Sequence, residues 1–220
     1  MGFIRRIGTG AAATFAAAGL ALGLAAPANA LSDEETGDFI GQLTATYTDP
    51  SIESDGNPYD FDIVTKAALV TGATDILAGL DSFTLFAPND RAFEVLAKDL
   101  GLLGKNYRFG ANVDETRVFN AIAGLGTDTI TAVLLYHVLP NAKVTGQDVL
   151  SGPFTQRLTM ANDQKLRVTV LSRSARFPLI LLGDKDGKFF NDTVVRSKID
   201  VIETPNTVVH GISNVLLPKL

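Results

Sequence analysis

The chain has 220 residues, a formal net charge of −5 and no cysteine. That length suits one domain with a substantial core, and the missing cysteine excludes disulfides, thiol nucleophiles and lipid attachment through a thiol. The acidic balance argues against a nucleic-acid ligand, because the chain and the phosphate backbone repel each other.

The first thirty residues have the three parts of a secretory signal peptide. Arg5 and Arg6 form a short basic region, an apolar run rich in Ala follows over 7–26, and Ala28-Asn29-Ala30 is a cleavage box. A membrane anchor is the alternative, but the run is rich in small residues and ends in that box. We predict a signal peptide over 1–30, export to the periplasm, the cell surface or the medium, no membrane span after cleavage, and a bacterial source.

Residues 31–58 are predicted to form a helix and a linker. Ser32 and Glu35 have the spacing of a capping box, and apolar residues then recur at helical spacing as far as Tyr47. The linker is rich in Asp, Pro, Ser and Gly, which is typical of a loop. The main domain is predicted to span 59–220.

Helical patterns dominate the first half of this domain. Helices are predicted at 61–68, 74–78, 90–98, 114–123 and 128–135, with Asp60 as the cap of the first. A short apolar strand is predicted at 82–87, where Pro88-Asn89-Asp90 ends it and caps the next helix. The Gly-rich, aromatic stretch 99–112 is predicted to be an exposed loop.

Strand patterns dominate the second half. Strands are predicted at 136–139, 154–160, 166–171, 179–182, 193–202, 208–212 and 215–217, with a short helix at 147–150. Helices first and strands later predict an α+β domain. This many short strands need two packed sheets or a closing barrel.

Three blocks of sequence carry a resemblance to a known family. They are SFTLFAPNDRAF at 82–93, LLYHVLP at 134–140 and NTVVHGISNVLLP at 206–218. In this order they resemble the two signature motifs of the fasciclin domain and the Tyr-His pair between them, over 59–218. The resemblance implies a single wedge-shaped β-sandwich of two sheets with a helical layer, its helices mostly N-terminal. It also implies a non-catalytic extracellular or cell-surface binding module, usually active in cell adhesion.

The same resemblance nominates partner-binding residues. Tyr136 and His137 match the Tyr-His pair, which is associated with receptor binding, and His210 lies in the second motif. Asp200 lies where the family often has an Asp-Ile pair, although one extra residue follows it and Thr207 replaces the usual Gly. Because strand side chains alternate between faces, one of Tyr136 and His137 is expected at the surface.

Each of these residues also has a structural interpretation. The two histidines could be packed with satisfied ring nitrogens, and Asp200 could be a solvated carboxylate at a strand edge. No third ligand stands at metal spacing, so neither a metal nor a cofactor is predicted. Asp184 to Lys188 vaguely resembles a calcium loop, but a hairpin turn fits its Asp-Gly better.

Two further stretches are candidate binding surfaces. Basic residues gather at 165–176, where they form either a patch for an acidic polysaccharide or a solvated strand face. Tyr107-Arg108-Phe109 forms either a contact loop or a loop folded back on its own core.

The function expected from these observations is non-catalytic adhesion. The expected partner is a cell-surface protein or an extracellular polysaccharide, with homophilic contact as a possibility. A small-molecule or carbohydrate binder of the envelope is the alternative, and a secreted hydrolase is a weaker one. No G-x-S-x-G elbow, Walker loop or dinucleotide fingerprint is present.

Overall fold

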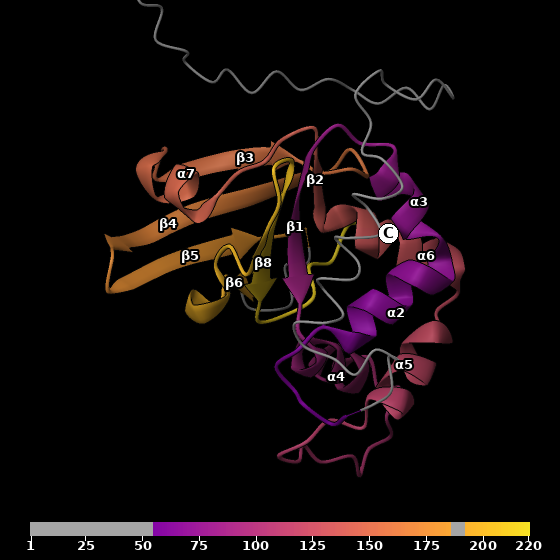
Figure 1. Ribbon diagram of the computed structural model, residues 1–220. Coiled ribbons are helices and arrows are strands. Elements are labelled where there is room, and N and C mark those ends of the chain that lie inside the picture. Colours follow the sequence, from indigo (N-terminus) through magenta and orange to yellow (C-terminus); the bar gives the residue numbers. More distant parts are fainter. Residues whose placement is uncertain (1–54, 186–191) are drawn as a thin grey trace, which may run out of the picture.

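The computed structural model describes residues 55–185 and 192–220. Two four-stranded sheets lie beside a group of helices (Figure 1). Most helices precede most strands in the chain, which confirms the α+β class and the two-sheet architecture. The predicted signal peptide, the helix at 31–47 and the turn after Lys185 lie outside the described residues.

Helices form one side of the molecule. They are α2 (Asp62–Thr71), α3 (Ala73–Ala78), α4 (Asp90–Asp99), α5 (Glu115–Ala123) and α6 (Thr127–Tyr136). The side chain of Asn89 caps α4 by accepting from the Ala92 N–H, and Asp114 caps α5 by accepting from the Arg117 N–H. Both caps confirm the predicted helix starts.

The cap predicted for α2 is wrong. The helix begins after Phe61, which makes no side-chain cap, and Asp60 lies outside the capping position. The Oδ1 atom of Asp90 accepts instead from the Ile63 N–H at 2.9 Å. The carboxyl group of Asp90, at the start of α4, thus satisfies a free N–H at the start of α2. The two residues are far apart in the chain, so local sequence does not predict this contact.

The first sheet has the strand order β2-β1-β8-β7. Its strands are β1 (Phe83–Pro88), β2 (Val138–Pro140), β7 (Ile202–Glu203) and β8 (Thr207–Ile212). The central pair, β1 and β8, is parallel and buried along its whole length. Strands buried on both faces are mostly apolar, and these two are interrupted only by the buried polar residues Thr84, Thr207 and His210.

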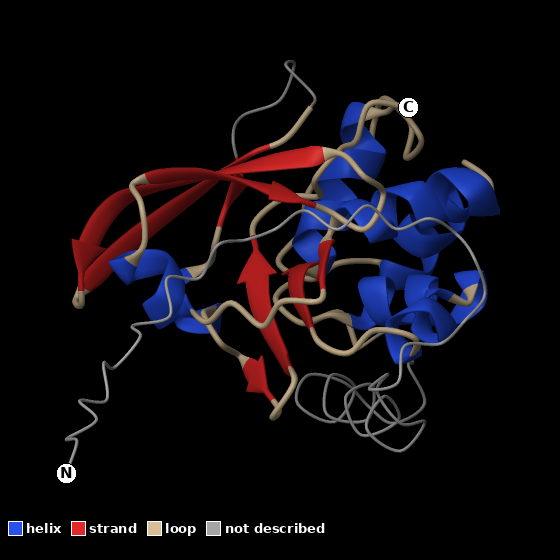
Figure 2. Cartoon of the chain, turned by 90° about the horizontal axis from the view of Figure 1, so that it is seen from above, coloured by secondary structure: helices blue, strands red, loops and turns tan. Residues whose placement is uncertain are grey.

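The second sheet is an antiparallel array in the order β3-β4-β5-β6. Its strands are β3 (Thr155–Thr159), β4 (Lys165–Ser174), β5 (Phe177–Gly183) and β6 (Asp192–Thr193). The helix α7 (Gly146–Ser151) precedes it, and a short 3-10 helix, η1 (Arg196–Lys198), follows. Figure 2 shows its long hairpin on the side opposite the main helices.

Two apolar cores hold these layers together. One lies between the helices and the first sheet and includes Phe61, Phe83 and Val118. The other lies between the two sheets and includes Phe86 and Leu182. The alternation of Phe83 and Phe86 between the cores follows from the strand repeat, so β1 is the central element of the domain.

Three predicted strands are absent or different. The strand predicted at 136–139 starts later, because α6 continues through Tyr136 and the His137 N–H bonds to the Leu134 carbonyl. The one predicted at 193–202 is interrupted by η1 and by Asp200, whose φ is 52°. No strand forms at 215–217 within the described chain, since side chains take the backbone donors there.

Candidate functional site

The three sequence blocks come together in the first sheet. β1 from the first block pairs with β2 from the second block on one side and with β8 from the third block on the other. In this register Phe86 stands opposite His210, and their ring centroids are 5.7 Å apart. The blocks therefore form one continuous structural unit at the centre of the domain.

His137 links the end of α6 to the third block through its two ring nitrogens, one bonded to each segment. Its Nδ1 lies 2.8 Å from the Val133 carbonyl oxygen, and its Nε2 lies 2.9 Å from the Leu216 backbone nitrogen. The first contact requires a proton on Nδ1 and the second requires a bare Nε2, which defines a neutral tautomer. Burial lowers the pKa of His137 to about 4, consistent with that neutral form.

His210 makes a second link, between β8 and the start of α7. Its Nε2 donates to the Val144 carbonyl at 2.9 Å, and its Nδ1 accepts from the Asp200 backbone N–H at 3.2 Å. Burial lowers the pKa of His210, against the opposing effects of Val144 and Asp200. The Asp200 carboxylate in turn accepts from the Gly146 N–H at 2.8 Å.

Tyr136 and His137 are both buried, contrary to the expectation that one would reach the surface. That expectation assumed a strand, whereas Tyr136 is the last residue of α6 and His137 is its C-terminal cap. The Tyr136 hydroxyl donates to the Lys165 carbonyl at 3.0 Å, which connects α6 to β4. Burial raises the pKa of Tyr136 well above its usual range.

This arrangement limits the chemistry of both histidines. Each ring nitrogen of His137 and His210 is hydrogen-bonded to a backbone group, so none is available to hold a metal or move a substrate proton. The nearest carboxylate, that of Asp200, lies 3.4 Å from the His210 Nδ1. These hydrogen bonds give both histidines a role in supporting the fold. Partner binding by these residues stays a prediction.

The outer side of the second sheet is a different kind of surface. We call Arg157, Lys165 and Arg167 the basic face; all three are exposed on β3 and β4, and Arg157 stands directly opposite Arg167. The basic cluster predicted at 165–176 therefore extends across two neighbouring strands.

The end of the β4–β5 hairpin adds exposed rings and cations. We call Phe154, Arg173, Arg176 and Phe177 the hairpin tip. Phe154 and Phe177 are 64% and 58% exposed. The Arg173 guanidinium lies 3.9 Å from the centroid of the Phe154 ring, and that of Arg176 lies 5.4 Å from the Phe177 ring.

The loop at 99–112 folds back on the helices. The Tyr107 hydroxyl bonds to Glu94, and its ring packs against the helical core. Phe109 is 45% exposed, with the Lys98 ammonium 3.9 Å from its ring centroid. Of the two predictions for this loop, the folded-back one is confirmed for Tyr107, whereas Phe109 remains accessible.

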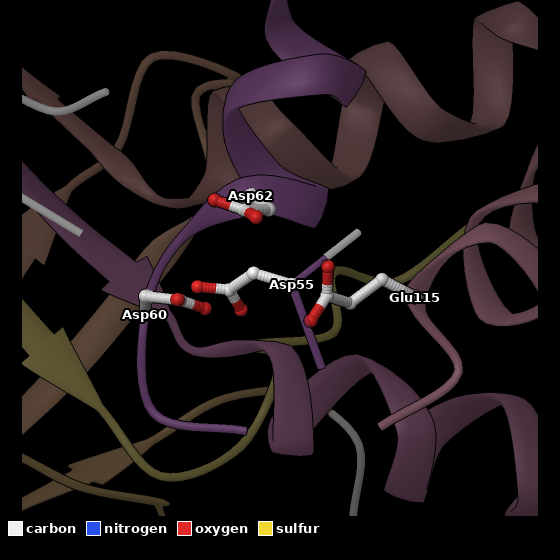
Figure 3. Close-up of side chains that lie close together, drawn as sticks. All are labelled: Asp55, Asp60, Asp62 and Glu115. Atoms are coloured by element: carbon white, nitrogen blue, oxygen red, sulfur yellow. The ribbon is translucent and has the colours of Figure 1, made fainter. Parts of the chain in front are cut away.

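Four carboxylates meet at the helical end of the molecule, and none was a predicted site residue. Asp55, Asp60, Asp62 and Glu115, here called the acidic cluster, each offer an oxygen within 4.8 Å of the others. Figure 3 shows Asp55 between Asp60 and Glu115, with Asp62 close by. Two of them, Asp62 and Glu115, are the first residues of helices, where an acid is favoured by the helix dipole. Their positions in the sequence therefore gave no sign that they meet in space.

No single helix within 55–185 or 192–220 is long and apolar enough to cross a membrane. One pair, α5 with α6, reaches the required length and composition only when taken together, and the two helices bend by 108° at their junction.

The chain was compared with known proteins. A search of curated proteins finds no match. Among solved structures, the chain is similar to a FAS1 domain pair from the insect cell adhesion molecule fasciclin I, with a TM-score of 0.48 and 17% identity. That match covers 69% of this chain and 43% of the other, so the chain spans less than half the length of its structural relative. The family model of the fasciclin domain matches residues 60–218, and the chain therefore belongs to the fasciclin domain family.

Proposed function

We propose that this protein is a non-catalytic adhesion module that acts outside the cytoplasm and docks an acidic polysaccharide on its basic face. Family membership supports the adhesion role, and the predicted signal peptide supports the location. The observation that carries the docking surface is the placement of two exposed arginines, Arg157 and Arg167, directly opposite each other.

The second sheet has a net charge opposite in sign to that of the whole chain. Residues 154–183 contain five basic side chains and one acid, Asp163, for a net charge of +4 in a chain of −5. Like charges directly opposite across two strands are destabilising. A carboxylated or sulfated polysaccharide would relieve that repulsion, and planar guanidinium groups bind such anions in a bidentate manner.

The hairpin tip offers a second, apolar surface on the same sheet. Phe154 and Phe177 are covered on one side by arginines and are otherwise accessible. Phe and Arg are both enriched in the cores of protein interfaces relative to the rest of the surface, and Arg is also enriched at binding hot spots. In the proposal, the basic face supplies charge attraction and the hairpin tip supplies apolar contact with the partner.

The four family residues have an indirect role in this proposal. Tyr136, His137, Asp200 and His210 are hydrogen-bonded to backbone groups of neighbouring elements. Tyr136 in particular bonds to the carbonyl of Lys165, a residue of the basic face. We infer that they position the strands that carry the contact residues, and that their loss weakens binding through the fold.

The test is binding of the purified protein to carboxylated, sulfated and neutral polysaccharides immobilised on a surface. The double variant Arg157→Glu/Arg167→Glu is expected to lose at least about tenfold in affinity for the acidic polymers. Its matched control is Lys105→Glu/Arg108→Glu, which changes the net charge equally at exposed positions of the 99–112 loop. The control is expected to bind as the wild type does.

Other outcomes identify other partners. Equal binding to neutral polymers, insensitive to salt, would favour the carbohydrate binder of the envelope over this proposal. Binding to intact cells that survives removal of their polysaccharide would favour a cell-surface protein. If the double variant and its control lose affinity equally, the basic face is not the docking surface.

A further inference from the structure

The acidic cluster gathers four carboxylates at one point of the described chain. Asp60, Asp62 and Glu115 are buried, while Asp55 is exposed and faces the same point. Neither carboxylate oxygen of Asp60 or of Asp62 accepts a hydrogen bond within the part of the chain that the structure describes. Buried carboxylates without donors are costly and rare, because burial removes the water that would solvate them.

A fifth carboxyl group lies next to the cluster. Asp90 is fully buried, and its Oδ2 has no hydrogen-bond partner among the described residues, while its Oδ1 accepts from the Ile63 N–H. Burial, together with the neighbouring Asp60, raises the pKa of Asp90 to about 10. Burial also raises the pKa of Asp62 to about 8, with Asp60 and Glu115 adding to the effect.

A positive side chain of the described chain, Lys198, and three helix starts lie near the cluster. Lys198 interacts with Asp60, and its ammonium lies 5.2 Å from the Phe61 ring centroid. Asp62, Asp90 and Glu115 are the first residues of α2, α4 and α5, where the helix dipole favours an acid. Helix dipoles explain one acid at each helix start. They do not explain why three starts converge or why Asp60 and Asp62 lack donors.

The backbone holds the acids of the loop in place. The carbonyl of Gly56 accepts from the Val113 N–H at 3.1 Å, beside α5. The carbonyl of Asp60 accepts from the Asp90 N–H at 3.2 Å, at the start of α4. Gly56, next to Asp55, and Asp60 are thereby anchored to the starts of α5 and α4. Asp55 itself is exposed to solvent.

We propose that the acidic cluster binds Ca²⁺. Its candidate ligand atoms are all carboxylate oxygens, which come from a loop and two helix starts. Hard cations such as Ca²⁺ prefer oxygen ligands. Ca²⁺ accepts six to eight oxygens in flexible geometry, whereas Mg²⁺ requires a near-ideal octahedron and retains water. A bound Ca²⁺ ties the 55–62 segment to the start of α5 and offsets the cost of burying several carboxylates at one point.

The experiment uses the purified full chain, freed of metal with a chelator and dialysed. Calorimetric titration at pH 7.5 is expected to show saturable Ca²⁺ binding, and the melting temperature is expected to rise in about 5 mM CaCl₂ relative to chelator. Mg²⁺ at the same concentration is expected to give a much smaller rise. A flat calorimetric trace, or an equal response to Mg²⁺, would overturn the Ca²⁺ assignment.

Variants separate a bound ion from a general effect of charge. Asp62→Asn and Glu115→Gln are each expected to weaken Ca²⁺ binding at least about tenfold. Asp128→Asn is the matched control, because Asp128 is an exposed acid in the first turn of α6. In chelator, Asp62→Asn is expected to fold and to melt no lower than the wild type, since it loses a buried carboxylate. Loss of the Ca²⁺ response in Asp128→Asn as well would contradict the site.

Discussion

The Nε2 atom of His137 accepts a hydrogen bond from the backbone N–H of Leu216, across 2.9 Å and 79 residues of sequence. This single contact occupies the N–H that a strand at 215–217 would have used for pairing. It joins the end of α6 to the C-terminal segment, and Val133 supplies the matching acceptor on the other side of the ring. A buried histidine here acts as a bridge between two stretches of backbone.

Replacing this bridge should destabilise the fold. His137→Ala leaves the Leu216 N–H and the Val133 carbonyl without partners and opens a cavity. We expect a loss of about 2–4 kcal/mol in the free energy of unfolding. Urea unfolding followed by circular dichroism measures it. A variant that keeps full stability yet loses partner binding would show instead that His137 contacts the partner.

The same residue predicts a dependence of stability on pH. The pKa of His137 is about 4 in the folded protein against 6.5 for free histidine, so the unfolded chain binds more protons between these values. Stability from this residue is complete above pH 6.5 and is lost as the pH falls toward 4, by an amount on the order of 3 kcal/mol. Urea unfolding at several pH values should show a shallower acid-side fall in His137→Gln than in the wild type.

Removing the Tyr136 hydroxyl is expected to destabilise the fold less than removing the His137 ring. Tyr136→Phe removes the hydroxyl that donates to the Lys165 carbonyl and keeps the ring in the core. The expected loss is about 1 kcal/mol, the net value of one buried hydrogen bond. Tyr59→Phe is the matched control, because Tyr59 is 61% exposed. Thermal melts of both variants measure the difference, and only Tyr136→Phe is expected to melt below the wild type. Equal melting temperatures of the two variants would argue against a structural role for the Tyr136 hydroxyl.

Local signals in the sequence predicted the elements that depend on local contacts. Asn89 and Asp114 cap α4 and α5 through N–H groups three residues away, and both helix starts were predicted. β1 was predicted from its apolar run, which is also a local signal, and it extends one residue further than predicted, through Pro88. The sequence could not show that Asp90 caps α2, since that contact spans 27 residues.

The same reasoning explains the errors at the candidate site. Tyr136 and His137 were assigned to a strand, but α6 ends with a helical carbonyl-to-amide contact that places both side chains inside. The acidic cluster was missed because each acid has an ordinary local explanation as a helix start or a loop residue. Their convergence depends on how α2 and α5 pack, which a single sequence does not specify.

Glycine at position 146 is predicted to be required by the close approach of the 199–200 turn. A Cβ at Gly146 would lie 2.2 Å from the Ile199 Cγ2 and 3.0 Å from the Asp200 Oδ2. Gly146→Ala should therefore cost about 1–3 kcal/mol, because the turn must move and its hydrogen bond to the Gly146 N–H weakens. At Gly79 the nearest atom to an added Cβ is 3.4 Å away, so Gly79→Ala is the control. Chemical unfolding measures the free energy of unfolding of both variants. Equal losses in the two variants would contradict the tight packing at Gly146.

The buried acids predict a pH dependence opposite in sign to that of His137. The pKa of Asp62 is raised to about 8 in the folded protein, so the folded state binds more protons than the unfolded chain between pH 3.8 and pH 8. Without metal, the stability contributed by this group is complete below pH 3.8 and is lost as the pH rises toward 8. Unfolding in chelator should therefore show a fall in stability as the pH rises from 3.8 to 8, and this fall should be smaller in Asp62→Asn. Saturating Ca²⁺ should reduce that fall in the wild type, because the ion replaces the protons on the carboxylates. A fall of equal size in the wild type and in Asp62→Asn would mean that another group, such as Asp90 or Asp192, controls it.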